Sequence, residues 1–147
     1  MKRIILFIFL LVSLSVNSQK IYSGKTQYQS KIICNVSKGY IYQGSTQYQS
    51  KIIGYFDGKY LYQGNSKYSS DIIATWSNNR IYKGRSTSDF NLIATYKNGR
   101  LYYRNSYDII FRYEKNKVYY GDFTYDSAIL INTSGYVHPI ILFYIIN

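Results

Sequence analysis

Five tyrosines recur at a spacing of twenty residues and form the most regular set of functional side chains in the sequence. They are Tyr22, Tyr42, Tyr62, Tyr82 and Tyr102. If the chain forms a sheet whose strands pair in sequence order, these rings lie two strands apart, at roughly 9.6 Å. Flat rings at that spacing suit an extended polymer such as a polysaccharide, whose sugar faces stack on aromatic side chains. They are candidate ligand-binding residues.

A second interpretation of the tyrosine column stays open. The rings can instead form a layer of packing with the isoleucines of the neighbouring strands, in which case they contact no ligand. The isoleucines concerned are Ile33, Ile53, Ile73 and Ile93. Solvent exposure of the rings distinguishes the two interpretations.

Other side chains with chemical potential are few. His138 is the single histidine and Cys34 the single cysteine, so they cannot build a repeated metal site, and we expect no metal or cofactor. A Ser–His–Asp arrangement would need Asp126, but no motif places its serine. The aspartates fall in turns and connections, where Asp is ordinarily a turn former. We therefore expect a non-catalytic protein.

Cys34 belongs to a repeated position that otherwise holds small residues. Gly54, Ala74 and Ala94 occupy the equivalent place in the following repeats. A free cysteine packs like a small apolar residue. We therefore expect a buried thiol, and a single cysteine excludes a disulfide within the chain.

The elements that position these residues come from an internal repeat. Ile21-Tyr22-Ser23-Gly24 recurs with modest changes at 41–44, 61–64 and 81–84, and then less faithfully at 101–104 and 118–121. Tyr136-Val137 opens a last, truncated unit. Near copies in phase indicate a tandem array of one supersecondary unit. The Ile or Leu before each Tyr is a core position, and the repeated glycine is expected to leave room for a neighbouring ring or to bend the strand.

Each unit has the pattern of a β-hairpin. Ile72, Ala74 and Trp76 alternate with polar residues, which is typical of a strand with one apolar face, and Ile32, Cys34 and Val36 follow the same rule. Asn98-Gly99 is a strong signal for a two-residue turn.

The turn fixes the expected pairing. With Asn98-Gly99 at the turn, Tyr96 pairs with Leu101 and Thr95 with Tyr102. The repeat predicts the same for Trp76 with Ile81. In the second unit, Asp57-Gly58-Lys59 leaves the register open by one residue.

A single hairpin is only marginally stable in water, so the units must pack side by side. The predicted fold is all-β: an antiparallel meander of about ten to twelve strands, two per unit. Because adjacent strands rotate by roughly 20–25°, this many strands should curl, either as a twisted single sheet or as a rolled, barrel-like solenoid.

The Tyr-x-Gly of each unit, with a hairpin turn in every repeat, resembles a MORN-type repeat array over residues 20–137. In repeat length the units are also similar to the aromatic hairpin repeats of choline-binding modules. The further glycines of MORN repeats and the paired tryptophans of choline-binding repeats are missing. The resemblance therefore implies an architecture and carries over no lipid or choline ligand.

Residues 1–18 have the pattern of a secretory signal peptide. Lys2 and Arg3 precede an apolar stretch, 4–14, that is too short to span a bilayer, and a cut before Gln19 is plausible. Residues 19–147 then form a single repeat domain, exported or attached to the cell surface. The run Ile140 to Ile146 has the length of a strand, so no membrane span is expected after cleavage.

Charge narrows the partner. Lys and Arg number 18 against 7 Asp and Glu, for a net charge of +11. This favours an anionic polymer as the partner, although the charge also serves solubility. Export argues against an intracellular nucleic acid.

Three functions remain in order. The first is a secreted or surface-attached protein that binds a polysaccharide, another anionic polymer or a protein partner through one sheet face. The second is a structural protein that assembles through exposed strand edges, with Ile140-Ile141-Leu142-Phe143-Tyr144 as an apolar terminal strand. The third is a hydrolase on a β scaffold.

Overall fold

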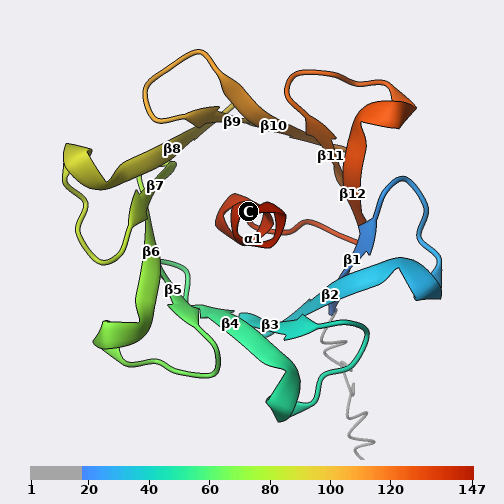
Figure 1. The fold of residues 1–147 in the computed structure, drawn as a ribbon, viewed down its shortest axis with the longest axis horizontal. Helices are drawn as coiled ribbons and strands as arrows, with labels where there is room; N and C mark the ends of the chain where they lie inside the picture. The colour runs from blue at the N-terminus through green and yellow to red at the C-terminus, as the bar shows by residue number, and fades with distance from the viewer. Residues whose placement is uncertain (1–17) are drawn as a thin grey trace, which may run out of the picture.

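The computed structural model describes residues 18–147 and shows a ring of twelve antiparallel strands around one central helix (Figure 1). The strands pair in sequence order as an all-β meander, as predicted. The strands are β1 (Gln19–Ser23), β2 (Ile32–Ser37), β3 (Tyr40–Gln43), β4 (Ile52–Phe56), β5 (Tyr60–Gln63), β6 (Ile72–Ser77), β7 (Arg80–Lys83), β8 (Leu92–Lys97), β9 (Arg100–Tyr103), β10 (Ile109–Glu114), β11 (Lys117–Tyr120) and β12 (Ile129–Thr133). Helix α1 (Pro139–Ile146) follows.

The sheet closes because the first and last strands pair with each other. Tyr22 of β1 lies opposite Asn132 of β12, as Tyr102 lies opposite Thr95 in an ordinary hairpin. Thus β12 and β1 form a sixth hairpin whose two halves come from the two ends of the ring. The prediction that Tyr136-Val137 opens a last unit is wrong, because β1 already occupies that strand's place.

The tight turns have the predicted register. Tyr96 pairs with Leu101 and Thr95 with Tyr102 across a turn in which Asn98 and Gly99 both adopt positive φ. Trp76 pairs with Ile81 in the same way. In the second unit Phe56 pairs with Leu61, which settles the open register in phase with the other units.

A β-bulge interrupts each strand that enters a hairpin, and this corrects the predicted alternation. Ile21 lies opposite Cys34 and Tyr22 opposite Ile32, so Ile33 is the extra residue. A bulge turns consecutive side chains to one face. Ile33 therefore packs against the core, and the prediction that Ile32 shares a face with Cys34 is wrong.

The repeated glycine has a conformational role. Gly24, Gly44, Gly64 and Gly84 have positive φ, and a Cβ at any of them would meet no atom within 4 Å. The predicted need for room is therefore wrong: the position requires the left-handed backbone that glycine adopts without cost. In that conformation the Gly44 amide donates to the carbonyl of the bulge residue Ile33, at 2.8 Å.

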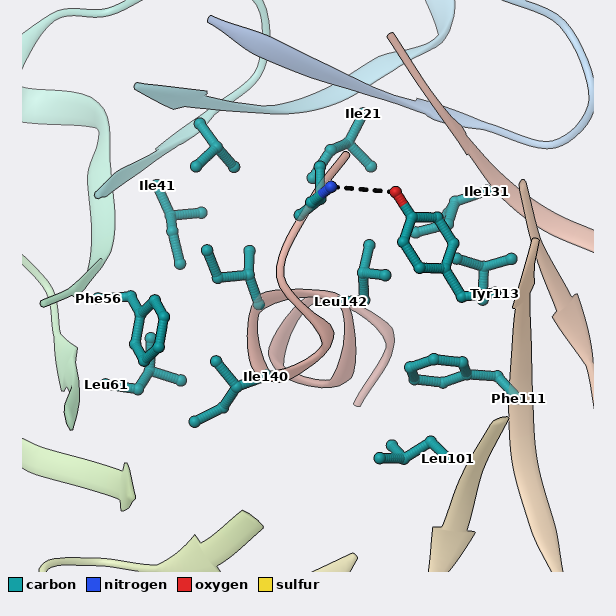
Figure 2. Close-up of a cluster of buried hydrophobic side chains, with 14 of the residues drawn as sticks. Ile21, Ile41, Phe56, Leu61, Leu101, Phe111, Tyr113, Ile131, Ile140 and Leu142 are labelled. Carbon is teal, nitrogen blue, oxygen red and sulfur yellow. Dashed lines mark hydrogen bonds between the residues drawn. The ribbon is translucent and has the colours of Figure 1, made fainter. Parts of the chain in front are cut away.

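The core lies inside the ring (Figure 2). Each of the six hairpins contributes the predicted apolar residue before its tyrosine. These residues are Ile21, Ile41, Leu61, Ile81, Leu101 and Val118, and all are fully buried. They surround Ile140 and Leu142 of α1, which no solvent reaches.

Helix α1 corrects the prediction of a terminal strand. A short apolar run is ambiguous between a strand and a helix that is buried on all sides. The closed ring offers no strand edge for pairing, so a segment in its apolar centre must satisfy its backbone hydrogen bonds internally. Pro139 stands in the first turn, and His138 caps the helix by accepting a bond from the Ile140 amide, at 3.4 Å.

The predicted signal peptide falls almost wholly on residues 1–17, outside the described residues, and stays a prediction. Within 18–147, no helix is long and apolar enough to cross a membrane.

Candidate functional site

Six connections between hairpins project outward around the ring (Figure 1). They span residues 24–31, 44–51, 64–71, 84–91, 104–108 and 121–128. Five of them end in a 3-10 turn: Gln29–Lys31, Gln49–Lys51, Ser69–Asp71, Asp89–Asn91 and Asp126–Ala128. The connections are the most repetitive surface of the molecule.

The tyrosine column lies on the outer face of the ring, beneath these connections. Tyr22, Tyr62 and Tyr82 are less than a tenth exposed, while Tyr42 and Tyr102 are half-buried. The column is therefore a packing layer rather than an exposed ladder. Its predicted neighbours are also corrected: Tyr22 lies opposite Ile32, whereas Ile33, Ile53, Ile73 and Ile93 face the core.

A different set of aromatic side chains is exposed. One lies in each connection, and we call them the rim aromatics: Tyr28, Tyr48, Tyr68, Phe90, Tyr107 and Tyr125. Their exposed fractions range from 54% at Tyr125 to 96% at Tyr107. Tyr28, Tyr48, Tyr68 and Tyr125 each stand immediately before a 3-10 turn, so the same local geometry presents all four. An exposed aromatic repeated in this way is typical of a contact surface.

Each connection covers the middle residue of a row of cross-strand neighbours on the outer face. In the sixth hairpin, Asn132 is that residue, and the Gln27 amide donates to its side-chain oxygen at 2.8 Å. In the second hairpin, the Lys67 ammonium lies 4.2 Å from the centre of the Tyr55 ring. These contacts hold the connections against the sheet, so the rim aromatics have defined positions.

An ion-pair cluster fastens the sixth connection. Asp122 accepts a 2.6 Å bond from the Arg100 guanidinium and lies 3.4 Å from Arg112, which also pairs with Glu114 at 2.7 Å. The Arg100 guanidinium holds the pKa of Asp122 below its usual value. These cations are neutralised locally and are poor candidates for an anionic ligand.

The first two connections carry cations beside their aromatics. Both contain the sequence Tyr-Gln-Ser-Lys, and the amides of Lys31 and Lys51 each donate to the carbonyl of the preceding tyrosine at 2.8 Å. Both lysines are exposed. Tyr28 with Lys31 and Tyr48 with Lys51 are thus two matched pairs of an aromatic ring and a cation.

The candidate catalytic residues do not come together. His138 lies inside the ring between Phe56 and Trp76, with ring centres 4.7 and 4.5 Å away, and burial lowers its pKa to about 4. Asp126 lies on the outer rim, 4.0 Å from Lys25. Residues 18–147 contain no group of His, Cys, Asp and Glu that could hold a metal ion.

Cys34 is buried, as predicted. Burial raises the pKa of its thiol to about 11, which keeps it protonated and unreactive at neutral pH.

The rim aromatics were missed as site residues at the level of sequence. Tyr28, Tyr48 and Tyr68 recur in phase within polar connections, where no packing requirement explains an aromatic. That recurrence was the available signal. It was obscured because Tyr22, Tyr42 and Tyr62 recur with the same period.

Comparison with known families places the fold. The family model described as "6-fold beta flower protein" matches residues 18–143. The match agrees with six hairpins around one axis and supports a tandem hairpin-repeat family, and it does not confirm the MORN-type resemblance. That description names no reaction. Comparisons with curated proteins and with solved structures give no match.

Proposed function

Because the chain belongs to the 6-fold beta flower family and presents one aromatic side chain on each connection of a closed ring, we propose that it binds an anionic polysaccharide through its rim. It does so as an exported, non-catalytic protein. The observation that carries the proposal is the ring of exposed aromatics.

The repetition suits a repetitive ligand. Each exposed ring offers a flat apolar surface to a sugar, a contact of about 1 kcal/mol. A polymer that reaches several connections gains avidity, since every contact after the first is intramolecular. Weak individual contacts are thereby sufficient for useful affinity.

The charge of the protein favours an acidic polymer. Lys and Arg exceed Asp and Glu by eleven, and Lys31 and Lys51 stand beside exposed tyrosines. Such charges steer a polyanion to the rim and are screened by salt. Binding should therefore weaken as ionic strength rises.

Assembly through strand edges has less support. Each of the twelve strands between Gln19 and Thr133 is paired on both sides, and the apolar C-terminal run is a helix inside the ring. A sheet edge that could accept another chain is thus absent from the described residues.

Catalysis has less support as well. The candidate acid, base and nucleophile residues are dispersed between the core and the rim, and the family description names no reaction. A non-catalytic role remains the proposal.

The test is affinity electrophoresis of the mature chain in gels that contain polygalacturonate or, in a parallel gel, a neutral glucan. We expect polygalacturonate to retard the wild-type chain and the double variant Tyr28→Ala, Tyr48→Ala to bind about tenfold more weakly, given about 1 kcal/mol per ring. The matched control is Tyr136→Ala, which removes a ring that is 62% exposed but lies outside the connections. Equal retardation of the double variant and the wild type would refute the role of the rim.

A further inference from the structure

A solvent-open hollow of about 380 Å³ lies on the outer face of the fifth hairpin. Its volume is within the range of small-molecule sites. The residues used below are Thr95, Lys97, Asn98, Tyr102, Arg104 and Ser106, all of which line it.

The hollow exists because the fifth connection is short. Five residues, 104–108, join β9 to β10, whereas eight residues, 84–91, join β7 to β8. The Ser106 hydroxyl and amide both donate to the Tyr103 carbonyl, at 2.7 and 2.9 Å, and the Ser106 hydroxyl accepts from the Asp108 amide at 3.1 Å. These bonds fold the connection tightly at the strand ends, so it cannot cover the row beneath.

The row beneath this connection is left with an unpartnered group. Thr75, the equivalent residue one hairpin earlier, is fully buried and donates its hydroxyl to the Gly84 carbonyl at 2.6 Å. The Thr95 hydroxyl is also buried, but it has no hydrogen-bond partner among the described residues. A buried polar group without a partner is rare in native proteins and is commonly satisfied by a bound molecule. An oxygen seated in the hollow would supply the missing bond.

Arg104 stands in a backbone conformation that favours glycine. Its φ is +50°, and the equivalent positions of the other five connections are Gly24, Gly44, Gly64, Gly84 and Gly121, all with positive φ. Arginine in this region is strained relative to glycine. The side chain therefore has a role that offsets the strain, and its guanidinium lies at the edge of the hollow.

The charge of the lining is of one sign. Lys97 and Arg104 are its two ionisable cations, and no carboxylate lines it. Within residues 18–147, neither takes part in a salt bridge. The remaining lining is hydroxyl, amide and phenol, which suits a ligand that carries hydroxyl groups next to a negative charge.

We propose that this hollow binds one carboxylated sugar residue, free or at the end of a chain. The Arg104 guanidinium and the Lys97 ammonium bind the carboxylate. Asn98 and Ser106 bond the sugar hydroxyls, one of these hydroxyls or a water that it orders reaches Thr95, and Tyr102 forms an apolar wall. The site is separate from the rim aromatics Tyr28 and Tyr48 and does not depend on polymer binding there.

The test is titration of the ¹⁵N-labelled mature chain with D-glucuronate, with D-glucose as the neutral probe. We expect saturable shifts of the amides at 95–98 and 104–107 with glucuronate, and at least tenfold weaker binding of glucose. Arg104→Gly should weaken glucuronate binding at least tenfold while the melting temperature stays equal or rises, because glycine fits the backbone. The matched control, Arg85→Gly, removes an exposed arginine from the neighbouring connection and should bind like the wild type.

A tetrasaccharide that ends in glucuronate distinguishes the source of the ligand. Saturation by the monosaccharide, the tetrasaccharide or both supports the site and tells whether the sugar is recognised free or on a chain. Saturation by neither overturns the proposal and shows that the hollow holds water only. Equal binding by Arg104→Gly and the wild type also overturns it, and both results are independent of the behaviour of Tyr28→Ala, Tyr48→Ala.

Discussion

The Tyr144 hydroxyl donates a 2.8 Å hydrogen bond to the carbonyl of Ile53, and this bond joins the central helix to the ring. Ile53 is the bulge residue of β4, and its carbonyl also accepts from the Gly64 amide at 2.9 Å. Gly54 lies beside it, where a Cβ would approach the Tyr144 ring to 3.3 Å. The missing side chain at Gly54 and the bulge carbonyl together fix where α1 sits in the ring.

Tyr144→Phe should therefore lower the free energy of unfolding by about 1 kcal/mol, the usual net contribution of one such bond. The loss is limited because Ile53 keeps its bond from Gly64. Denaturant titration measures it, with Tyr136→Phe, an exposed tyrosine on the segment that leads to α1, as the control. A loss equal to that of the control would mean that the bond does not anchor the helix.

Two equivalent threonines should respond in opposite directions to the same substitution. Thr75→Val breaks the bond to Gly84 and should lower the free energy of unfolding by about 1–2 kcal/mol. Thr95→Val removes a buried hydroxyl that has no partner, so stability should be unchanged or up to about 1 kcal/mol higher.

Thermal melts of the two variants without any sugar check this contrast. A clear loss of stability in Thr95→Val would show that its hydroxyl is already bonded, for instance to an ordered water. Thr95→Ser, which retains the hydroxyl, separates that bond from the loss of packing.

The stability of the ring should fall with acid because His138 is neutral in the core. Burial lowers its pKa from 6.5 to about 4, so the unfolded chain binds the proton more readily than the folded chain. The penalty is absent above pH 6.5, grows as the pH falls and is complete near pH 4. It should reach about 2 kcal/mol, allowing for the partial exposure of the imidazole.

His138→Asn isolates this contribution, since Asn can cap the helix and does not titrate. The difference between the variant and the wild type in free energy of unfolding should shift in favour of the variant between pH 7 and pH 4. A difference that is constant over this range would show that His138 is solvated in the native state.

Much of the local structure could be predicted from the sequence. The turn at Asn98-Gly99 and the pairing of Tyr96 with Leu101 follow from turn chemistry and period-two alternation, and both are confirmed. Ile21 and Leu101 are buried, as their place before the tyrosines predicts.

The bulge could not be predicted, because both candidate residues are isoleucine. Ile32 and Ile33 differ in nothing but position, so alternation alone cannot tell which one faces the core. That error also misplaced the neighbours of the tyrosine column.

Closure left a signal that pattern reasoning did not use. The described chain starts with the second strand of a hairpin, Gln19–Ser23, and its last strand is a first strand, Ile129–Thr133. An array offset by half a unit in this way can close by pairing its two ends. Once the ring is closed, its apolar centre requires a helix rather than a thirteenth strand.

The central claim is that connections around a closed ring bind an anionic polysaccharide through exposed aromatics. The most direct measurement is an NMR titration of the ¹⁵N-labelled mature chain with oligogalacturonate, at low and at high salt. The account predicts saturable shifts concentrated in 24–31, 44–51 and 64–71, weaker at high salt, with the inner residues Ile41 and Leu142 unmoved. Saturable shifts that avoid the connections, or none at the concentrations that retard the protein in gels, would contradict it.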